Sequence, residues 1–214
     1  MKKTFEIEKI RDSLYEKLSE CFDFVEQYGE TFEADKGYNP KLTSIAKKYV
    51  ENFETLSAKG QGLLLYGSYG CGKTFASHQI ANALIDKGYR VKALTLGTLL
   101  DHCHADGYPA TYFNNLARFD LVVLDNFDTD FPCKKMRRFV YGIINKLYEA
   151  RTPFIITTNL KAEVLKNPTD ADEARVYDRI LERCPRPIDA SASNIRYKIL
   201  REELAEYSQA LGTT

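Results

Sequence analysis

The sequence predicts an α/β protein built on a parallel sheet. Short, continuous apolar runs cover residues 63–66, 121–124 and 154–158, and a weaker run covers 91–96. Helix-length segments separate these runs, as in parallel sheets whose strands are buried on both faces. Each of the three strong runs ends in glycine or a polar residue. Because ligands of open α/β sheets bind at the carboxyl ends of the strands, the runs point to one shared site.

Length and composition narrow the class of protein. The 214 residues are 44% apolar and 28% charged, which is typical of a globular domain with one sizeable core. Thirty Lys and Arg balance thirty Asp and Glu, which excludes a globally basic nucleic-acid-binding surface but not a local basic patch. No apolar run approaches the roughly 18–20 residues of a membrane span. Five scattered cysteines and the lack of a secretory h-region lead us to expect a cytoplasmic protein with no membrane partner.

The sequence predicts two helices before the first strand. Apolar residues spaced by two to four over residues 4–27 predict an amphipathic helix, and similar spacing over 42–53 predicts a second. The turn residues of 32–40 predict a linker between them.

A phosphate-binding loop follows the first predicted strand. It fits the pattern G-x-x-x-x-G-K-[ST] and comprises Gly67, Ser68, Tyr69, Gly70, Cys71, Gly72, Lys73 and Thr74. In such a loop, backbone N–H groups surround phosphate oxygens at the N-terminus of the next helix. Lys73 is expected to reach the β- and γ-phosphates of ATP, and the Thr74 hydroxyl to ligate Mg²⁺. An apolar stripe over residues 76–85 supplies the helix that the motif requires.

Polar residues follow two other predicted strands. Asp125 follows residues 121–124, where a Walker-B carboxylate would hold Mg²⁺ through water. Asn159 follows residues 154–158 and would bring an amide near the γ-phosphate and the attacking water. The alternative for Asn159 is a turn or N-cap residue, because it opens a new segment.

Several stretches carry a family resemblance. Beside the phosphate loop they are residues 37–41 (GYNPK), 49–53 (YVENF), 80–85 (IANALI), 157–160 (TTNL), 177–182 (YDRILE) and 194–196 (NIR). With them the chain resembles, from about Phe32 to its C-terminal helix, the AAA+ ATPases of the DnaC/DnaI helicase-loader and IstB transposition-helper group. The resemblance implies a P-loop core with a five-stranded parallel sheet between helices. We expect this AAA+ domain over residues 37–214, a short helical extension and linker over 1–36, and self-association through shared ATP sites.

The resemblance also implies roles for three polar residues. Asn159 resembles sensor 1, Arg179 the arginine finger given to a neighbour's γ-phosphate, and Arg196 the sensor-2 arginine. From the residues alone, Arg179 and Arg183 would belong to a solvated ion-pair face with the adjacent acids, and Arg196 would be a helix-surface charge. The predicted catalytic set is Lys73, Asp125, Asn126, Asn159, Arg179 and Arg196.

The sequence departs from the family at Asn126. AAA+ enzymes usually carry a second acid after the Walker-B aspartate, and that acid polarises the attacking water. An amide orients water but does not accept a proton at neutral pH. Asp128 and Asp130 are close enough in sequence to substitute. We therefore predict that hydrolysis is slow, or is rescued by Asp128.

These features favour an ATP-dependent loader or remodeller of a replicative helicase at DNA. The alternatives are an ATPase partner of a transposase, a nucleotide-gated binding module with little turnover, and a small-molecule P-loop kinase. A basic cluster at residues 134–138 makes single-stranded DNA a candidate partner. Such a cluster is also typical of a solvated helix start.

Overall fold

The computed structural model describes residues 20–22, 25–105, 110–127, 134–168, 171–192 and 194–211. Its centre is a five-stranded sheet with the order β2-β3-β4-β1-β5, in which every pair of neighbours is parallel. The strands are β1 (Leu63–Tyr66), β2 (Val91–Thr95), β3 (Leu121–Asp125), β4 (Phe154–Thr158) and β5 (Ile188–Asp189). The predicted α/β class and five-stranded parallel sheet are confirmed.

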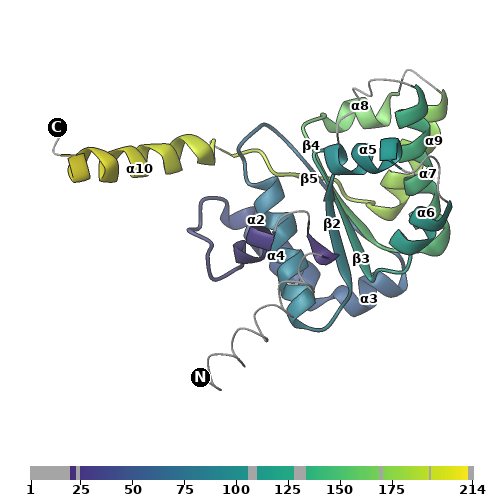
Figure 1. Cartoon of the computed structure of the whole chain (residues 1–214), viewed down its shortest axis with the longest axis horizontal. Coiled ribbons are helices and arrows are strands. Elements are labelled where there is room, and N and C mark those ends of the chain that lie inside the picture. The colour runs from purple at the N-terminus through teal and green to yellow at the C-terminus, as the bar shows by residue number, and fades with distance from the viewer. Residues whose placement is uncertain are drawn as a thin grey trace.

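Helices cover both faces of the sheet (Figure 1). The described helices are η1 (Val25–Gly29), α2 (Pro40–Glu51), α3 (Phe53–Ala58), α4 (Lys73–Asp86), α5 (Leu96–Ala105), α6 (Ala110–Leu116), α7 (Lys134–Ala150), α8 (Ala162–Lys166), α9 (Ala171–Arg183) and α10 (Ile195–Leu211). Helices α2 and α4 lie on one side of the sheet, and α5 to α9 lie on the other.

The central strands are mostly apolar up to their carboxyl ends because each face of the sheet packs on its own core. In β3, Val122 and Leu124 belong to the core under α7, whereas Leu121 and Val123 belong to the core under α4. Alternate residues of a strand point to opposite faces, so a doubly covered strand is a continuous apolar run. This is the pattern on which the strand predictions rested.

The predicted helix over 42–53 divides in two. It begins at Pro40, where the Asn39 side chain accepts a hydrogen bond from the Leu42 backbone, and it ends at Glu51. Asn52 then separates α2 from α3. Most of the helix predicted over 4–27 lies outside the described residues, and residues 25–29 form a 3₁₀ helix instead of continuing it.

The segment predicted as a linker, residues 32–40, has the expected irregular backbone, but it packs on the domain: Asp35 accepts a hydrogen bond of 3.2 Å from Gln79 of α4. The residues just before this segment are attached to the same helix. Asn82 of α4 donates hydrogen bonds of 2.9 Å to the backbone oxygens of Gln27 and Glu30. Gln79, one turn earlier, donates to the Thr31 oxygen at 3.2 Å. The domain boundary at residue 36 stays a prediction.

The C-terminal helix α10 projects from the body (Figure 1). The side chains of Tyr197, Leu200, Leu204, Tyr207 and Leu211 are exposed on it. Within the described parts of the chain, no helix combines the length and the apolar composition of a membrane span.

Candidate nucleotide-binding site

The phosphate loop forms a tight cradle between β1 and α4. Gly67, Gly70 and Gly72 all have positive φ angles, of 141°, 72° and 93°, a conformation that is easy only for glycine. A Cβ on Gly70 would lie 2.3 Å from Asn194 Oδ1. Gly72 is the N-cap of α4 and supplies no side chain to cap it. The first N–H groups of α4 are therefore available to a phosphate.

The Lys73 ammonium lies inside this cradle and is 7% exposed. Its Nζ donates to the backbone oxygens of Gly67 and Ser68 at 2.9 Å and to Asn159 Oδ1 at 3.0 Å. The structure thus brings Asn159 to the phosphate loop, as predicted. Lys161 is the N-cap of α8, so Asn159 is not a capping residue.

Thr74 and Asp125, the two residues predicted to bind Mg²⁺, are in direct contact. Thr74 Oγ1 donates to the two carboxylate oxygens of Asp125 at 3.0 and 3.1 Å, and Asp125 is 3% exposed. Hydroxyl and carboxylate oxygens at one point are a donor set that suits Mg²⁺. The residues present therefore fit the ion that the motif implies.

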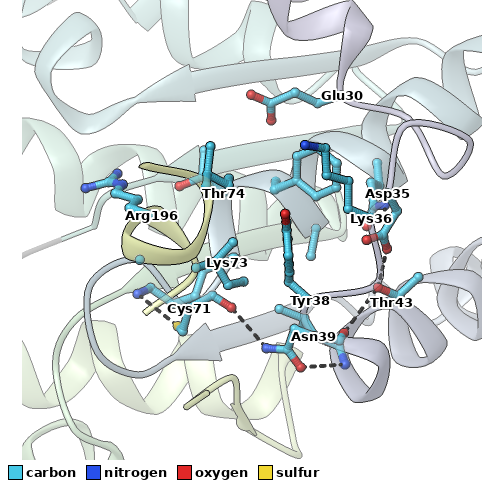
Figure 2. Close-up of a pocket in the computed structure, with 18 of the residues that line it drawn as sticks. Glu30, Asp35, Lys36, Tyr38, Asn39, Thr43, Cys71, Lys73, Thr74 and Arg196 are labelled. Atoms are coloured by element: carbon cyan, nitrogen blue, oxygen red, sulfur yellow. Dashed lines mark hydrogen bonds between the residues drawn. The ribbon is translucent and has the colours of Figure 1, made fainter. Parts of the chain in front are cut away.

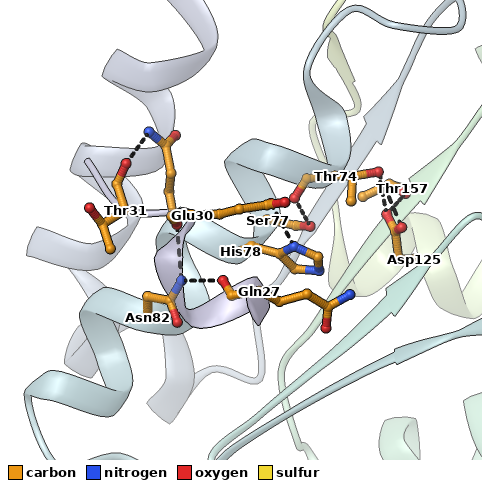
Figure 3. A network of polar contacts seen from close by, with 10 residues as sticks. Gln27, Glu30, Thr31, Thr74, Ser77, His78, Asn82, Asp125 and Thr157 are labelled. Atoms are coloured by element: carbon orange, nitrogen blue, oxygen red, sulfur yellow. Dashed lines mark hydrogen bonds and ion pairs between the residues drawn. The ribbon is translucent and has the colours of Figure 1, made fainter. Parts of the chain in front are cut away.

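Thr157 is a third member of this network, and the sequence reasoning missed its role (Figure 3). Its Oγ1 donates to Asp125 Oδ1 at 2.5 Å and accepts from the Asn126 backbone N–H at 3.0 Å. The signal lies in the register: Leu124 of β3 pairs with Ile156 of β4, so the next residues, Asp125 and Thr157, are neighbours. A prediction that β3 and β4 are neighbours in the sheet would therefore have placed Thr157 beside Asp125.

Asn126 is exposed at the edge of the same site. Its φ angle of 55° is left-handed, a conformation in which asparagine is enriched. The side chain lines the cavity described below. Asp128 and Asp130, the alternative bases, lie outside the described residues.

A cavity of about 420 Å³ opens above the phosphate loop (Figure 2). Four of the predicted catalytic residues line it: Lys73, Asn126, Asn159 and Arg196. Ile195 and Ile199 accompany Arg196 on the α10 side. The opposite wall comes from the segment before α2, through residues that include Glu30, Asp35 and Tyr38.

Polar contacts fasten that wall to α4 and α2. Glu30 Oε2 lies 2.8 Å from Nδ1 of the buried His78. The Asp35 carboxylate accepts hydrogen bonds from the Gly37 backbone, Thr43 and Gln79 at 2.7, 2.5 and 3.2 Å. Burial raises the pKa of Asp35, but these hydrogen bonds together outweigh it and hold the pKa below its ordinary value. The sequence reasoning missed this wall because its residues read as a linker.

Arg179 lies on α9 and does not line the cavity. Its Nη1 donates to Asn145 Oδ1 on α7, and its guanidinium carbon lies 5.5 Å from the centre of the Tyr148 ring. Among the described residues it forms no ion pair, and the Glu182 carboxylate accepts from the Tyr148 hydroxyl at 2.6 Å instead. The predicted ion-pair face is therefore absent from this part of the chain.

The basic cluster opens α7. Lys134 and Arg138 are exposed, Met136 is buried, and Arg137 Nη1 lies 3.9 Å from Glu173 Oε1. The charged side chains of Lys134 and Arg138 are therefore accessible to solvent, about one helical turn apart on α7.

Comparisons with known proteins agree with this geometry. Residues 31–198 match the family model of the IstB-like ATP binding protein. The replicative helicase loader DnaI of Bacillus subtilis (strain 168) is 25% identical over 169 residues, which cover 73% of this chain and 52% of the relative. The chain thus spans about half the length of that relative.

Solved structures share the fold. A crystal structure of DnaI has a TM-score of 0.59 at 20% identity, with 78% of this chain and 89% of the other covered. A crystal structure of the DnaC helicase loader has a TM-score of 0.54 at 26% identity, with coverages of 65% and 83%. Since the family model spans most of the chain, including the phosphate loop and the strands that end at the cavity, this chain belongs to the family of IstB-like ATP binding proteins, within the AAA+ group that includes DnaC and DnaI.

Proposed function

We propose that the chain binds ATP and Mg²⁺ in the cavity and uses them to load or remodel a replicative helicase at DNA. The observation that carries the nucleotide part is the convergence of Lys73, the Thr74–Asp125 pair and Asn159 on one phosphate cradle. These residues come from β1–α4, β3 and β4, so the shared site depends on the three adjacent central strands.

Each side chain has a definite task in this proposal. Lys73 exchanges its contacts with the Gly67 and Ser68 oxygens for phosphate oxygens, which are stronger, charge-assisted partners. Thr74 and Asp125 would hold Mg²⁺, whose charge offsets that of the phosphates. Arg196, exposed on the far side of the cavity, would contact the same phosphates.

Hydrolysis in this proposal is slow and depends on assembly. Asn126 lies where the family carries an acid, and an amide does not take a proton from water. Arg179 lies outside its own cavity, so it would act on the nucleotide of a neighbouring copy. A chain of this kind would act as a switch that remains in its ATP state.

A helicase is the favoured partner because the DnaI relative covers most of this chain. The second candidate is a transposase, because the matching family is that of the IstB-like ATP binding proteins and the sequence resembles the IstB transposition helpers. Single-stranded DNA is a proposed further partner, through the exposed Lys134 and Arg138.

Nucleotide binding is tested first, by titrating a fluorescent ATP analogue with and without Mg²⁺. Lys73→Ala should weaken binding by at least tenfold, because it removes the charge from the cradle. Lys59→Ala, at an exposed lysine away from the cavity, is the matched control and should bind as wild type. Equal affinity of Lys73→Ala and wild type would contradict the phosphate-loop assignment.

The partner is tested by pull-down from the host with the tagged chain. ATP-dependent capture of the replicative helicase, lost in Lys73→Ala, would support the loader. Capture of a transposase under the same conditions would favour the second candidate. Capture of neither would count against both, provided that ATP binding is intact.

A further inference from the structure

Side chains from two distant segments meet at the outer side of the cavity. Tyr38, in the loop before α2, donates from its hydroxyl to both carboxylate oxygens of Glu202 on α10, each at 2.6 Å. Lys36 Nζ lies 3.3 Å from Glu202 Oε2. Lys198, one turn before Glu202, has its Nζ 5.9 Å from the centre of the Tyr38 ring. We call these four residues the Glu202 clasp.

The clasp spans the cavity from wall to wall. Lys36 and Tyr38 line the cavity from the loop, and Figure 2 shows the Tyr38 ring standing between the phosphate loop and Lys36. Arg196 and Ile199 line the cavity from the same turns of α10 that carry Lys198 and Glu202. The clasp therefore links the two walls of the cavity, the loop before α2 and the first turns of α10.

The base of α10 is fastened to the phosphate loop. The Ile195 backbone N–H donates to the Gly70 oxygen at 2.8 Å, and Asn194 Oδ1 occupies the space that a Cβ on Gly70 would need. Thus α10 has two attachments, one at the phosphate loop and one at the clasp. The second is the outer one, and it holds the helix across the cavity.

The contacts of the clasp are weak enough to break and re-form. Lys36 and Glu202 expose 64% and 48% of their side chains, and an exposed ion pair of this kind is individually weak. Hydrogen bonding to the carboxylate raises the pKa of Tyr38, and the same bond lowers the pKa of Glu202. Near neutral pH the contact therefore keeps a protonated phenol against an ionised acid.

We propose that Glu202 is a positioning residue of the nucleotide site: by holding Tyr38 and Lys36, it keeps α10 closed over bound nucleotide and slows nucleotide release. The proposal rests on the binding of ATP in this cavity. It adds to that function a contact outside the phosphate loop that controls how long the nucleotide stays bound. Loss of the clasp should raise the dissociation rate more than it changes the association rate.

The test is a stopped-flow chase of a fluorescent ATP analogue by excess ATP, with Mg²⁺ present. Tyr38→Phe removes only the hydroxyl, and Glu202→Ala removes the acceptor. Each should raise the dissociation rate about two- to fivefold, as expected for a weak surface contact. The double variant should be no faster than Glu202→Ala, because both changes break one contact. Glu202→Gln, which keeps an acceptor oxygen, should recover part of the slow release.

Glu203→Ala is the matched control, since this acid is adjacent on the same helix and exposed, and it has no part in the clasp. It should release nucleotide as wild type. Wild-type release from Tyr38→Phe and Glu202→Ala, or effects that add in the double variant, would overturn the proposal. A wild-type chain that does not bind the analogue at all would instead overturn the nucleotide site, and the clasp with it.

Discussion

Thr157 joins Asp125 to Asn126: its hydroxyl donates to Asp125 Oδ1 at 2.5 Å and accepts from the Asn126 N–H at 3.0 Å. One buried hydroxyl thus orients the carboxylate that we propose as a Mg²⁺ ligand and holds the backbone of Asn126, the position at which the sequence departs from the family. Thr74 donates to the same carboxylate from the other side. The metal half of the site is therefore held by two threonines from different elements.

We expect Thr157→Val to weaken the Mg²⁺-dependent part of ATP binding. The change keeps the shape of the side chain but leaves a buried carboxylate oxygen and a backbone N–H without this partner, which costs about 1–3 kcal/mol. A Mg²⁺ titration of ATP affinity measures the effect, and thermal unfolding measures the loss of stability. Thr157→Ser retains the hydroxyl and should behave as wild type. A Val variant with unchanged Mg²⁺ dependence would exclude a role for Thr157 at the metal.

The comparison of sequence and structure shows which features local patterns encode. The strands β1, β3 and β4 were predictable because burial on both faces demands apolar residues throughout. By contrast β5 has two residues, Ile188 and Asp189, and it is a strand only because it pairs with β1. No pattern of its own distinguishes so short a segment.

The residues of the candidate site also fall into a group that the sequence predicts and a group that it does not. The phosphate loop and Asp125 were predictable because their chemistry is local to one strand end. Thr157 and the Asp35 wall were not, because their partners lie on other elements and depend on register and packing. The packing of Arg179 on Asn145 was equally out of reach, since it depends on how α9 lies against α7.

The Asp35 carboxylate should make the cavity wall sensitive to acid. Because hydrogen bonds hold its pKa below the ordinary value of 3.8, its stabilising effect is complete at neutral pH. The effect is lost as the pH falls through the lowered pKa, where the folded state must also take up the proton. Asp35→Asn should therefore lower stability at pH 7, by about 1 kcal/mol for a typical hydrogen-bonded group, and its difference from wild type should shrink as the pH falls below 3.8 and through the lowered pKa.

Thermal unfolding at a series of pH values measures this difference. For a chain of this length, 1 kcal/mol corresponds to about 2–4 °C in Tm. Glu54→Gln, at an exposed acid on α3, should show no such pH-dependent gap. A constant gap between Asp35→Asn and wild type from pH 7 to pH 3 would rule out the ionised carboxylate as the cause.

Arg179→Ala should bind ATP as wild type but lose at least tenfold in turnover within an assembly. Its position outside its own cavity is consistent with action on a neighbour's phosphoryl group, where an arginine finger stabilises developing charge. Mixing Arg179→Ala with Lys73→Ala should restore part of the turnover, because some interfaces then combine one intact half from each. Arg175→Ala, at an exposed arginine on the same helix, is the control. Absence of complementation in a verified mixed oligomer would argue against action in trans.

Asn126 lines the cavity one residue after Asp125. An acid at this position would take a proton from the attacking water, and such general-base catalysis is typically worth about 10²–10⁴-fold. Asn126→Asp should raise turnover by about tenfold or more with little change in ATP affinity. Aspartate, like asparagine, tolerates the left-handed backbone found here, so the variant should fold as wild type.

Two further variants test whether catalysis depends on the Asn126 amide or on Asp128. Asn126→Gly removes the side chain without backbone strain, and it should change turnover little if the amide contributes little catalysis. Asp128→Asn tests the other hypothesis, in which Asp128 serves as the base. Under that hypothesis wild type already turns over at an ordinary rate, and Asp128→Asn abolishes it. Steady-state phosphate release by these variants side by side decides between the two. If wild type hydrolyses ATP rapidly and neither Asn126→Asp nor Asp128→Asn alters the rate, the catalytic base lies elsewhere, because both candidate carboxylate positions have then been tested.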